Sequence, residues 1–344
     1  MRDVVVVGGG PIGLATALYA ARAGLDVVVH EPRPAPVDKA CGEGLMPGAV
    51  AELDALGIDL PGHPIAGIRY VAGRRSVDAP FMAGPGRGVR RTALHAALSE
   101  AAGREGVPIE RRTVRSLTQD VDGVLVDGER ARYVVAADGL HSTVRRLAGL
   151  EASRRGRRRY GLRRHLAMAP WTPFVEVHWS PRAEAYVTPV GVDCVGVAVL
   201  VDGGGDYDDL LTSFPALAER LAGAPASRVL GAGPLRQRSR HRVAGRVLLV
   251  GDASGYVDAL TGEGIALGLA QARAAVTAVR SGEAARYERA WRRLSWRHNA
   301  LTQGLLAATG RPALRRGLVP AADTVPWLFR AAVNELARPA VEPA

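Results

Sequence analysis

The stretch Val4-Val-Val-Val-Gly-Gly-Gly-Pro-Ile-Gly13 decides the fold of this chain of 344 residues. Its four consecutive valines are typical of a strand that is buried on both faces of a parallel sheet. The glycines that follow have the pattern of a dinucleotide-binding turn. Gly8 permits the tight turn out of the strand, Gly10 lets the backbone approach a pyrophosphate, and Gly13 lets the next helix pack closely on the sheet.

The residues after this turn complete a βαβ unit. Residues 14–23 predict a helix, and residues 27–31 predict the second strand. We expect phosphates to lie near Pro11 and Ile12, because the free N–H groups and the dipole of a helix N-terminus favour anions. Glu31 ends the second strand, where its carboxylate can accept hydrogen bonds from ribose hydroxyls.

Two further strands lead into turns that carry an aspartate. One buried run ends in Asp138-Gly139, and Ser142 is placed to cap the helix that follows. Another buried run ends in Gly251-Asp252, and the segment Gly262–Ile265 then opens a long helix. Each of these turns is weak evidence when taken alone, whereas the order of all three motifs is specific.

In order and spacing, the three motifs resemble those of the FAD-dependent class A monooxygenases, the group that includes p-hydroxybenzoate hydroxylase, and those of the related geranylgeranyl reductases. The resemblance covers residues 1 to 300. It implies that the first motif and Glu31 hold the ADP part of FAD, that the second lies near the pyrophosphate and the nicotinamide path, and that the third holds the ribityl chain. Transferred residue by residue, it assigns cofactor contacts to Gly8, Gly10, Pro11, Ile12, Gly13, Glu31, Cys41, Gly42, Arg91, Asp138, Gly139, Gly251, Asp252, Gly262, Gly264 and Ile265.

Three segments, Lys39–Pro47, Tyr160–His165 and Tyr186–Gly191, are more closely similar to bacterial hydroxylases that accompany type III polyketide synthases. This resemblance implies a secondary-metabolism enzyme that hydroxylates a phenolic or polyketide-derived ring, with dioxygen and with NAD(P)H as a transient co-substrate. A reductase that saturates isoprenoid double bonds is the first alternative, and a non-catalytic flavin-binding protein is the second. One departure is Asp258-Ala259, where the family has Asp-Pro, and it affects the backbone beside the flavin.

The segment from residue 160 to residue 201 alternates polar and apolar residues, which predicts antiparallel strands that should cover the flavin ring. We expect substrate contacts from four aromatic residues of these strands, Tyr160, His165, His178 and Tyr186. Alternation along Val175–Trp179 separates an apolar face from a face that carries Glu176 and His178. The predicted pocket is therefore largely apolar, with a few polar groups that orient a phenolic hydroxyl.

No side chain is assigned a catalytic role, and no set of metal ligands is predicted. Cys41 could be a nucleophile or a flavin-linkage site, but a lone cysteine in a glycine loop more simply packs as a small residue. Backbone N–H groups of Gly262–Ile265, at a helix start, suit the negative charge of a reduced flavin.

Together these elements predict an α/β protein with a Rossmann-like FAD-binding domain, an inserted antiparallel-sheet substrate domain and C-terminal helices. The expected boundaries are 1–67, 87–159 and 235–300 for the FAD-binding domain, 68–86 and 160–234 for the substrate domain, and 301–344 for a helical segment. A single helix is expected from Asp206 to Leu221, a strand region over residues 107–119, and a helix break at Pro320.

The net charge is +11, yet Lys39 is the only lysine among 45 basic residues, so arginine-rich composition explains the charge more simply than nucleic-acid binding. The arginines at 154, 155, 157, 158, 159, 163 and 164 are interpreted as a solvated face or a rim for flavin phosphates. The segment Val325–Val333 is most simply helix packing, with weak contact to a membrane surface as the alternative. Two unpaired cysteines and no basic leader favour the cytoplasm, and the expected partner is an aromatic or lipid-like small molecule.

Overall fold

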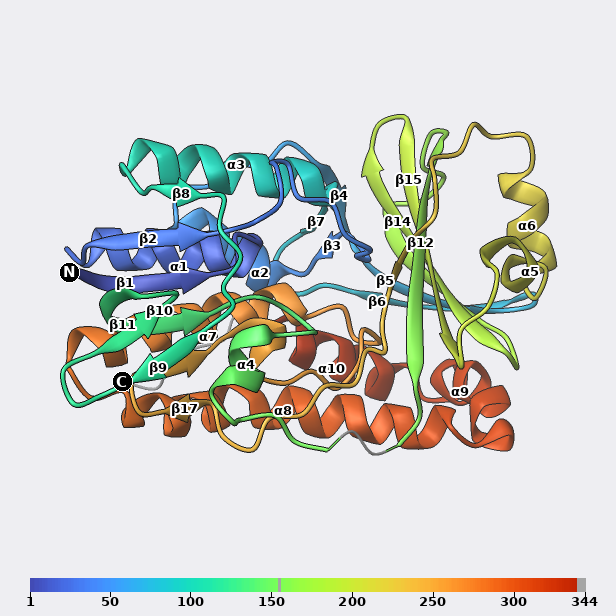
Figure 1. The fold of residues 1–344 in the computed structure, drawn as a ribbon. Helices are drawn as coiled ribbons and strands as arrows, with labels where there is room; N and C mark the ends of the chain where they lie inside the picture. Colours follow the sequence, from blue (N-terminus) through green and yellow to red (C-terminus); the bar gives the residue numbers. More distant parts are fainter. Residues whose placement is uncertain (154–155, 339–344) are drawn as a thin grey trace.

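The computed structural model describes residues 1–153 and 156–338, and Figure 1 shows two large sheets joined by long helices. The first sheet has eight strands. The order of six of them is β17 (Val243–Ala244), β18 (Val247–Leu249), β11 (Glu129–Ala136), β1 (Arg2–Val7), β2 (Val27–His30) and β8 (Ile109–Glu110). The other two branch from this path: β11 also pairs with β10 (Val124–Val126), which in turn pairs with β9 (Leu117–Gln119). The five strands from β18 to β8 run parallel, as the valine-rich sequence predicts.

Both faces of this sheet are covered, which accounts for its unbroken runs of valine. Val4 to Val7 are at most 6 % exposed. On one face lie α1 (Pro11–Arg22), α2 (Pro47–Ala55), α3 (Arg91–Arg104) and α7 (Gly264–Arg280). On the other face lie the β9–β10 hairpin and α4 (Thr143–Leu147). The carboxyl ends of β1, β11 and β18 are adjacent, so the three predicted turns meet at one edge.

The second sheet has seven strands, and it is antiparallel except for one pair. Its order is β16 (Leu230–Ala232), β12 (Arg159–Ala167), β15 (Cys194–Asp202), β14 (Ala183–Gly191), β13 (Phe174–Trp179), β5 (Gly67–Ala72) and β6 (Arg75–Pro80). The exception is β13, which pairs in parallel with β5 although the two strands lie about a hundred residues apart in the sequence. A small sheet of β3 (Gly44–Leu45), β7 (Gly86–Gly88) and β4 (His63–Ile65) connects the two large ones.

The two faces of the second sheet are covered by different elements. The outer face packs on α5 (Tyr207–Leu211) and α6 (Pro215–Leu221), at the far right of Figure 1. The inner face packs on α9 (Pro312–Thr324), α10 (Pro326–Ala337) and the end of α8 (Ala285–Thr309). The inner face is therefore turned toward the three turn motifs described above, the third of which forms the short helix η1 (Gly251–Ser254).

Three local predictions are wrong in detail. The single helix expected from Asp206 to Leu221 is split into α5 and α6, because Pro215 starts a new helix. Residues 107–119 contain only the short strands β8 and β9. Pro320 lies inside α9, and the chain breaks instead before Pro326.

Candidate functional site

A cavity of about 300 Å³ lies where the carboxyl ends of the parallel strands face the inner side of the second sheet. The three turn motifs form one wall, and the loop Arg33–Met46 forms a second. Strands of the second sheet form the third wall, and Leu305, Val333 and Leu336 of the C-terminal helices close it. Apolar side chains dominate the last two walls, whereas charged side chains gather beside the motifs.

The glycines at either end of the first motif are required by backbone packing. Gly8 has a φ of +103°, and a Cβ on it would lie 2.6 Å from the carbonyl oxygen of Ala137. A Cβ on Gly13 would lie 1.7 Å from the carbonyl oxygen of Gly8. These two residues shape the turn and do not line the cavity.

Glu31 also stabilises this turn. Its Oε2 accepts a hydrogen bond of 2.9 Å from the backbone N–H of Gly9, and Arg33 forms an ion pair with it at 2.8 Å. Although burial opposes ionisation, these donors lower the pKa of Glu31, so the side chain is a carboxylate at neutral pH. Glu31 is 4 % exposed and lies behind the cavity lining, whereas Arg33 belongs to the lining.

Gly10 and Arg91 form the part of the wall that suits a pyrophosphate. Gly10 is the N-cap of α1 and has no side-chain partner at that end of the helix. The Arg91 guanidinium lies beside it, 3.6 Å from the point that a Gly10 Cβ would occupy, and Arg91 Nε is buried without a hydrogen-bond partner among the described residues. A helix N-terminus, a turn without side chains and a half-buried guanidinium with an unpaired Nε together fit the phosphates of FAD.

The second motif keeps one carboxylate oxygen unpaired. Asp138 Oδ2 accepts hydrogen bonds from the backbone N–H groups of Thr143 and Val144, at 2.7 and 3.1 Å. Asp138 Oδ1 is buried without a partner among the described residues, and burial raises the pKa of Asp138. Ser142 caps α4 as predicted, accepting from the N–H of Arg145.

Arg145 ties the second motif to the third. Its guanidinium is 1 % exposed and donates to the carbonyl oxygens of Leu140 and Ala253, at 2.8 and 2.9 Å. The third motif also packs on the first, because a Cβ on Gly251 would lie 3.3 Å from the Ile12 side chain. The three turns therefore form a single packed unit.

The helix start after the third motif contains a buried hydrogen bond between a glutamate and a histidine. Glu263, the N-cap of α7, lies 2.8 Å from His298 Nδ1, and burial raises the pKa of Glu263. This carboxylate lies next to Gly262, Gly264 and Ile265, all of which line the cavity.

Of the predicted cofactor residues, three lie behind the lining: Gly8, Gly13 and Glu31. The others line the cavity together: Gly10, Pro11, Ile12, Cys41, Gly42, Arg91, Asp138, Gly139, Gly251, Asp252, Gly262, Gly264 and Ile265. Cys41 accepts a weak hydrogen bond from the N–H of Glu43, at 3.4 Å. This contact is consistent with a side chain that shapes the loop.

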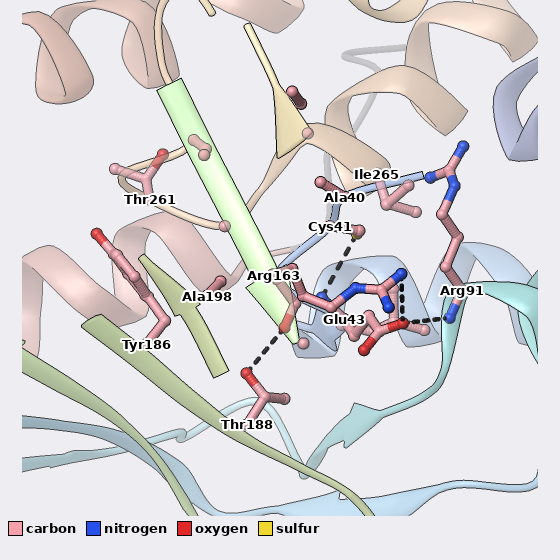
Figure 2. A pocket seen from close by; sticks show the side chains of 18 of the residues that line it. Ala40, Cys41, Glu43, Arg91, Arg163, Tyr186, Thr188, Ala198, Thr261 and Ile265 are labelled. Atoms are coloured by element: carbon pink, nitrogen blue, oxygen red, sulfur yellow. Dashed lines mark hydrogen bonds and ion pairs between the residues drawn. The ribbon is translucent and has the colours of Figure 1, made fainter. Parts of the chain in front are cut away.

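The register of the second sheet decides which side chains reach the cavity. One row of paired residues crosses five strands, from Tyr70 through Val177, Tyr186 and Ala198 to Arg163, and every member lines the cavity. Figure 2 shows Tyr186 and Ala198 in this wall, with Arg163, Glu43 and Arg91 grouped beside them. The row thus leads from an apolar region to a charged one.

Only one of the four predicted substrate residues, Tyr186, lines the cavity. The structure places Tyr160 and His178 on the outer face, where His178 contacts Glu176 and faces the Phe214 ring. The predicted alternation along Val175–Trp179 is correct, but the apolar side faces the cavity. The physical reason is that the C-terminal helices and the flavin-type motifs cover the apolar side, whereas α5 and α6 cover the other.

His165 is on the inner face but is covered by Glu43, a residue that the sequence reasoning missed. Glu43 Oε2 lies 2.5 Å from His165 Nε2, and Glu43 Oε1 accepts the N–H of Arg91 at 2.8 Å. Arg163 Nη1 donates to His165 Nδ1 at 3.0 Å, so His165 must carry its proton on Nε2 and donate it to Glu43. The only sequence signal for Glu43 is its position as an acidic residue between two glycines. The structure shows that this residue has a φ of +60°, which is uncommon outside glycine.

A second buried charge network fixes the loop that precedes α7. Glu184 pairs with Arg159 at 2.5 Å and with Arg315 at 2.8 Å, and Arg159 also reaches Asp258 at 3.3 Å. Burial raises the pKa of Asp258 to about 6, although Arg159 opposes the shift. The loop position at Asp258-Ala259 is therefore held by an ion pair.

Most arginines of the arginine-rich stretch are paired with carboxylates within the described residues, and Arg158 remains exposed. Arg157 pairs with Asp202, Arg163 pairs with Asp38, and Arg164 pairs with Asp208. Arg154 and Arg155 lie outside the described residues. Elsewhere, ligand atoms of His30, Glu110 and Glu129 lie within 4.8 Å of one another, but Arg112 pairs with both carboxylates and takes the place of a cation.

Comparison with known proteins identifies the relatives of this chain. A family model described as FAD binding domain matches residues 1–180. A menaquinone reductase of Mycolicibacterium smegmatis is 33 % identical over 336 residues, which cover 87 % of this chain and 81 % of the relative. Digeranylgeranylglycerophospholipid reductase 1 of Methanothermobacter thermautotrophicus is 29 % identical over 305 residues, covering 78 % and 74 %.

Solved structures have the same fold at lower identity. CmlS, a flavin-dependent halogenase, superposes with a TM-score of 0.78 at 19 % identity, covering 96 % of this chain and 72 % of that one. The α/β architecture predicted from the sequence is confirmed by this likeness. Among the described helices, none combines the length and the apolar character needed to cross a bilayer.

Proposed function

Because the chain belongs to the FAD binding domain family and is an FAD-dependent oxidoreductase, we propose that it is an NAD(P)H- and dioxygen-dependent monooxygenase for a phenolic ring that carries an apolar substituent. In this reaction NAD(P)H supplies two electrons, one oxygen atom enters a ring carbon, and the other leaves as water. Bound FAD supplies the redox chemistry between the two substrates.

The protein's own residues bind the cofactor and exclude water. Gly10, Arg91 and the N-terminus of α1 would hold the phosphates, and Asp138 and Asp252 would accept hydrogen bonds from hydroxyl groups. The inner face of the second sheet and the C-terminal helices enclose the reacting ring in apolar surroundings.

One observation carries the proposal. The three segments that resemble hydroxylases of polyketide pathways meet where the loop wall of the cavity joins the wall formed by the second sheet. Glu43 contacts His165, and Thr188 Oγ1 donates to the carbonyl oxygen of Gly42 at 2.8 Å. This wall continues into the apolar region around Val175 and Val177, a combination that suits a polar ring with an alkyl chain.

A second candidate is a reductase that saturates a double bond of an isoprenoid chain. The identities of 33 % and 29 % with a menaquinone reductase and a digeranylgeranylglycerophospholipid reductase favour it. The apolar lining by Leu305, Val333 and Leu336 accommodates an isoprenoid chain as well as an alkyl chain. The two candidates differ in whether dioxygen is consumed.

The deciding experiment compares turnover with and without air. Purified holoprotein is supplied with NADPH or NADH, together with 3-pentylphenol or with a short-chain menaquinone. We expect phenol-dependent dioxygen uptake and a product that gains one oxygen atom from labelled dioxygen. Saturation of the prenyl chain under strictly anaerobic conditions, with the phenol inert in air, would establish the reductase instead.

We also propose that an apolar substrate enters from a membrane surface. Trp327 and Leu328 of α10 are 68 % and 57 % exposed, and the same helix contributes Val333 and Leu336 to the cavity. Weak contact of this helix with lipid would place the entrance of the cavity next to a lipid-like substrate that is dissolved in the membrane.

A further inference from the structure

We propose that the hydroxyl of Tyr70 is the anchor that binds a ring oxygen of the substrate. This inference rests on the proposed function, because it takes an oxygen-bearing aromatic ring as the ligand. Tyr70 lies on β5, outside every motif used to identify the family, and lines the cavity. Its partners in the sheet, Val177 and then Tyr186, place it in the row that leads to Arg163.

The Tyr70 hydroxyl is available for a ligand. Among the described residues it has no hydrogen-bond partner, and its oxygen retains accessible surface. The neighbouring Tyr186 hydroxyl differs, because it already donates to the carbonyl oxygen of Leu260 at 3.1 Å. An unpaired hydroxyl in an apolar wall is a position where a polar ligand atom gains a bond that no protein group supplies.

The ring of Tyr70 is held in place, so the hydroxyl points to a fixed position. The Trp179 ring meets it edge-on at 5.4 Å between centroids, and the Phe329 ring lies 4.4 Å away. Phe329 comes from α10, so the sheet and a C-terminal helix hold the ring from two sides. A fixed donor loses little conformational entropy when it binds a ligand.

The hydroxyl acts as a donor at neutral pH. Burial, with a smaller contribution from the Glu184 carboxylate, raises the pKa of Tyr70 above its usual range. Glu184 forms ion pairs with Arg159 and Arg315, and no hydrogen bond joins it to Tyr70, so the tyrosine proton is available to a ligand. The ligand atom that matches this site is an acceptor oxygen, such as a phenol or quinone oxygen.

The test separates binding of the oxygen from binding of the chain. Affinities of holoprotein for 3-pentylphenol and for pentylbenzene are measured by flavin fluorescence in the wild type and in Tyr70→Phe. We expect the wild type to prefer the phenol and Tyr70→Phe to reduce that preference about 3- to 10-fold, with pentylbenzene binding unchanged. Tyr160→Phe, which removes a hydroxyl on the outer face, serves as the matched control and should retain the preference.

The anchor is refuted if the wild type shows no preference for the phenol, or if Tyr70→Phe retains it. Equal weakening of both probes would also refute it, because that result indicates lost packing. The proposed function is tested separately by dioxygen uptake. If the enzyme does not oxidise phenols, but Tyr70→Phe still reduces the preference for the phenol, the proposed role of Tyr70 is supported. The proposed monooxygenase activity is then refuted.

Discussion

Replacing Gly10 by alanine should separate cofactor binding from folding. Gly10 has a φ of −70° and a ψ of 177°, which alanine adopts readily, and its added Cβ would meet nothing closer than Arg91 Nη2 at 3.6 Å. We therefore expect the free energy of unfolding of the apoprotein to change by less than about 1 kcal/mol. The Cβ would stand where a pyrophosphate approaches the turn. Loss of one hydrogen bond to a charged group costs about 1.5–3 kcal/mol, so FAD should bind roughly 10- to 150-fold more weakly.

The assay titrates apoprotein with FAD and follows thermal unfolding of the same samples. Gly13→Ala is the matched control, because its Cβ would lie 1.7 Å from the carbonyl oxygen of Gly8 and neither backbone can yield. That variant should lose the native fold as well as the flavin. Wild-type FAD affinity in Gly10→Ala would refute the placement of the pyrophosphate, and a stable Gly13→Ala would refute the steric reasoning.

Two further outcomes follow from the buried charges. Because folding raises the pKa of Asp258 from 3.8 to about 6, the native state binds more protons than the unfolded state between these values, so this group's stabilisation is full below pH 3.8 and is lost as the pH rises through 6. To test this, we compare the free energies of unfolding of the wild type and of Asp258→Asn, measured with urea. The difference, wild type minus variant, should fall by up to about 3 kcal/mol between pH 4 and pH 7. A difference that does not depend on pH would contradict the raised pKa of Asp258. His165→Leu should cost about 3 kcal/mol of stability, because it leaves the buried Glu43 Oε2 without a donor among the described residues, whereas His178→Leu should cost less, since Glu176 Oε2 keeps the Trp171 donor. Equal losses in thermal unfolding of the two variants would argue against the Glu43–His165 contact.

The cofactor motifs could be predicted because their constraints are local. The requirement for glycine at positions 8 and 13 arises from backbone atoms that the strand–turn–helix geometry itself brings together. Most of the residues assigned by the resemblance accordingly lie around one cavity. Glu31 was placed at the correct strand end, but the sequence did not reveal that Gly9 and Arg33 would engage it.

The substrate wall was harder to predict because its constraints are non-local. Alternation along Val175–Trp179 defines two faces, but it does not say which of them the C-terminal helices will cover. Glu43 and His165 are 122 residues apart in the sequence, and neither position alone indicates a contact. The choice of His178 as a substrate residue failed for this reason, since a strand histidine reaches the cavity only if its face is the inner one.

Strand register connects the fold to the chemistry of the cavity. Because side chains alternate with a period of two, a shift of one residue between β5 and β13 would turn Ile68 and Tyr70 to the outer face. The shift would also turn Arg69 and its partner Asp78 toward the apolar cavity, because β5 and β6 form one hairpin, and would separate Arg69 from Glu176, its partner on β13 at 3.7 Å. Moving these two charged side chains from a partly solvated face into an apolar cavity costs several kcal/mol of desolvation, so the ion pairs on the outer face select the register that presents the Tyr70 hydroxyl on the inner one.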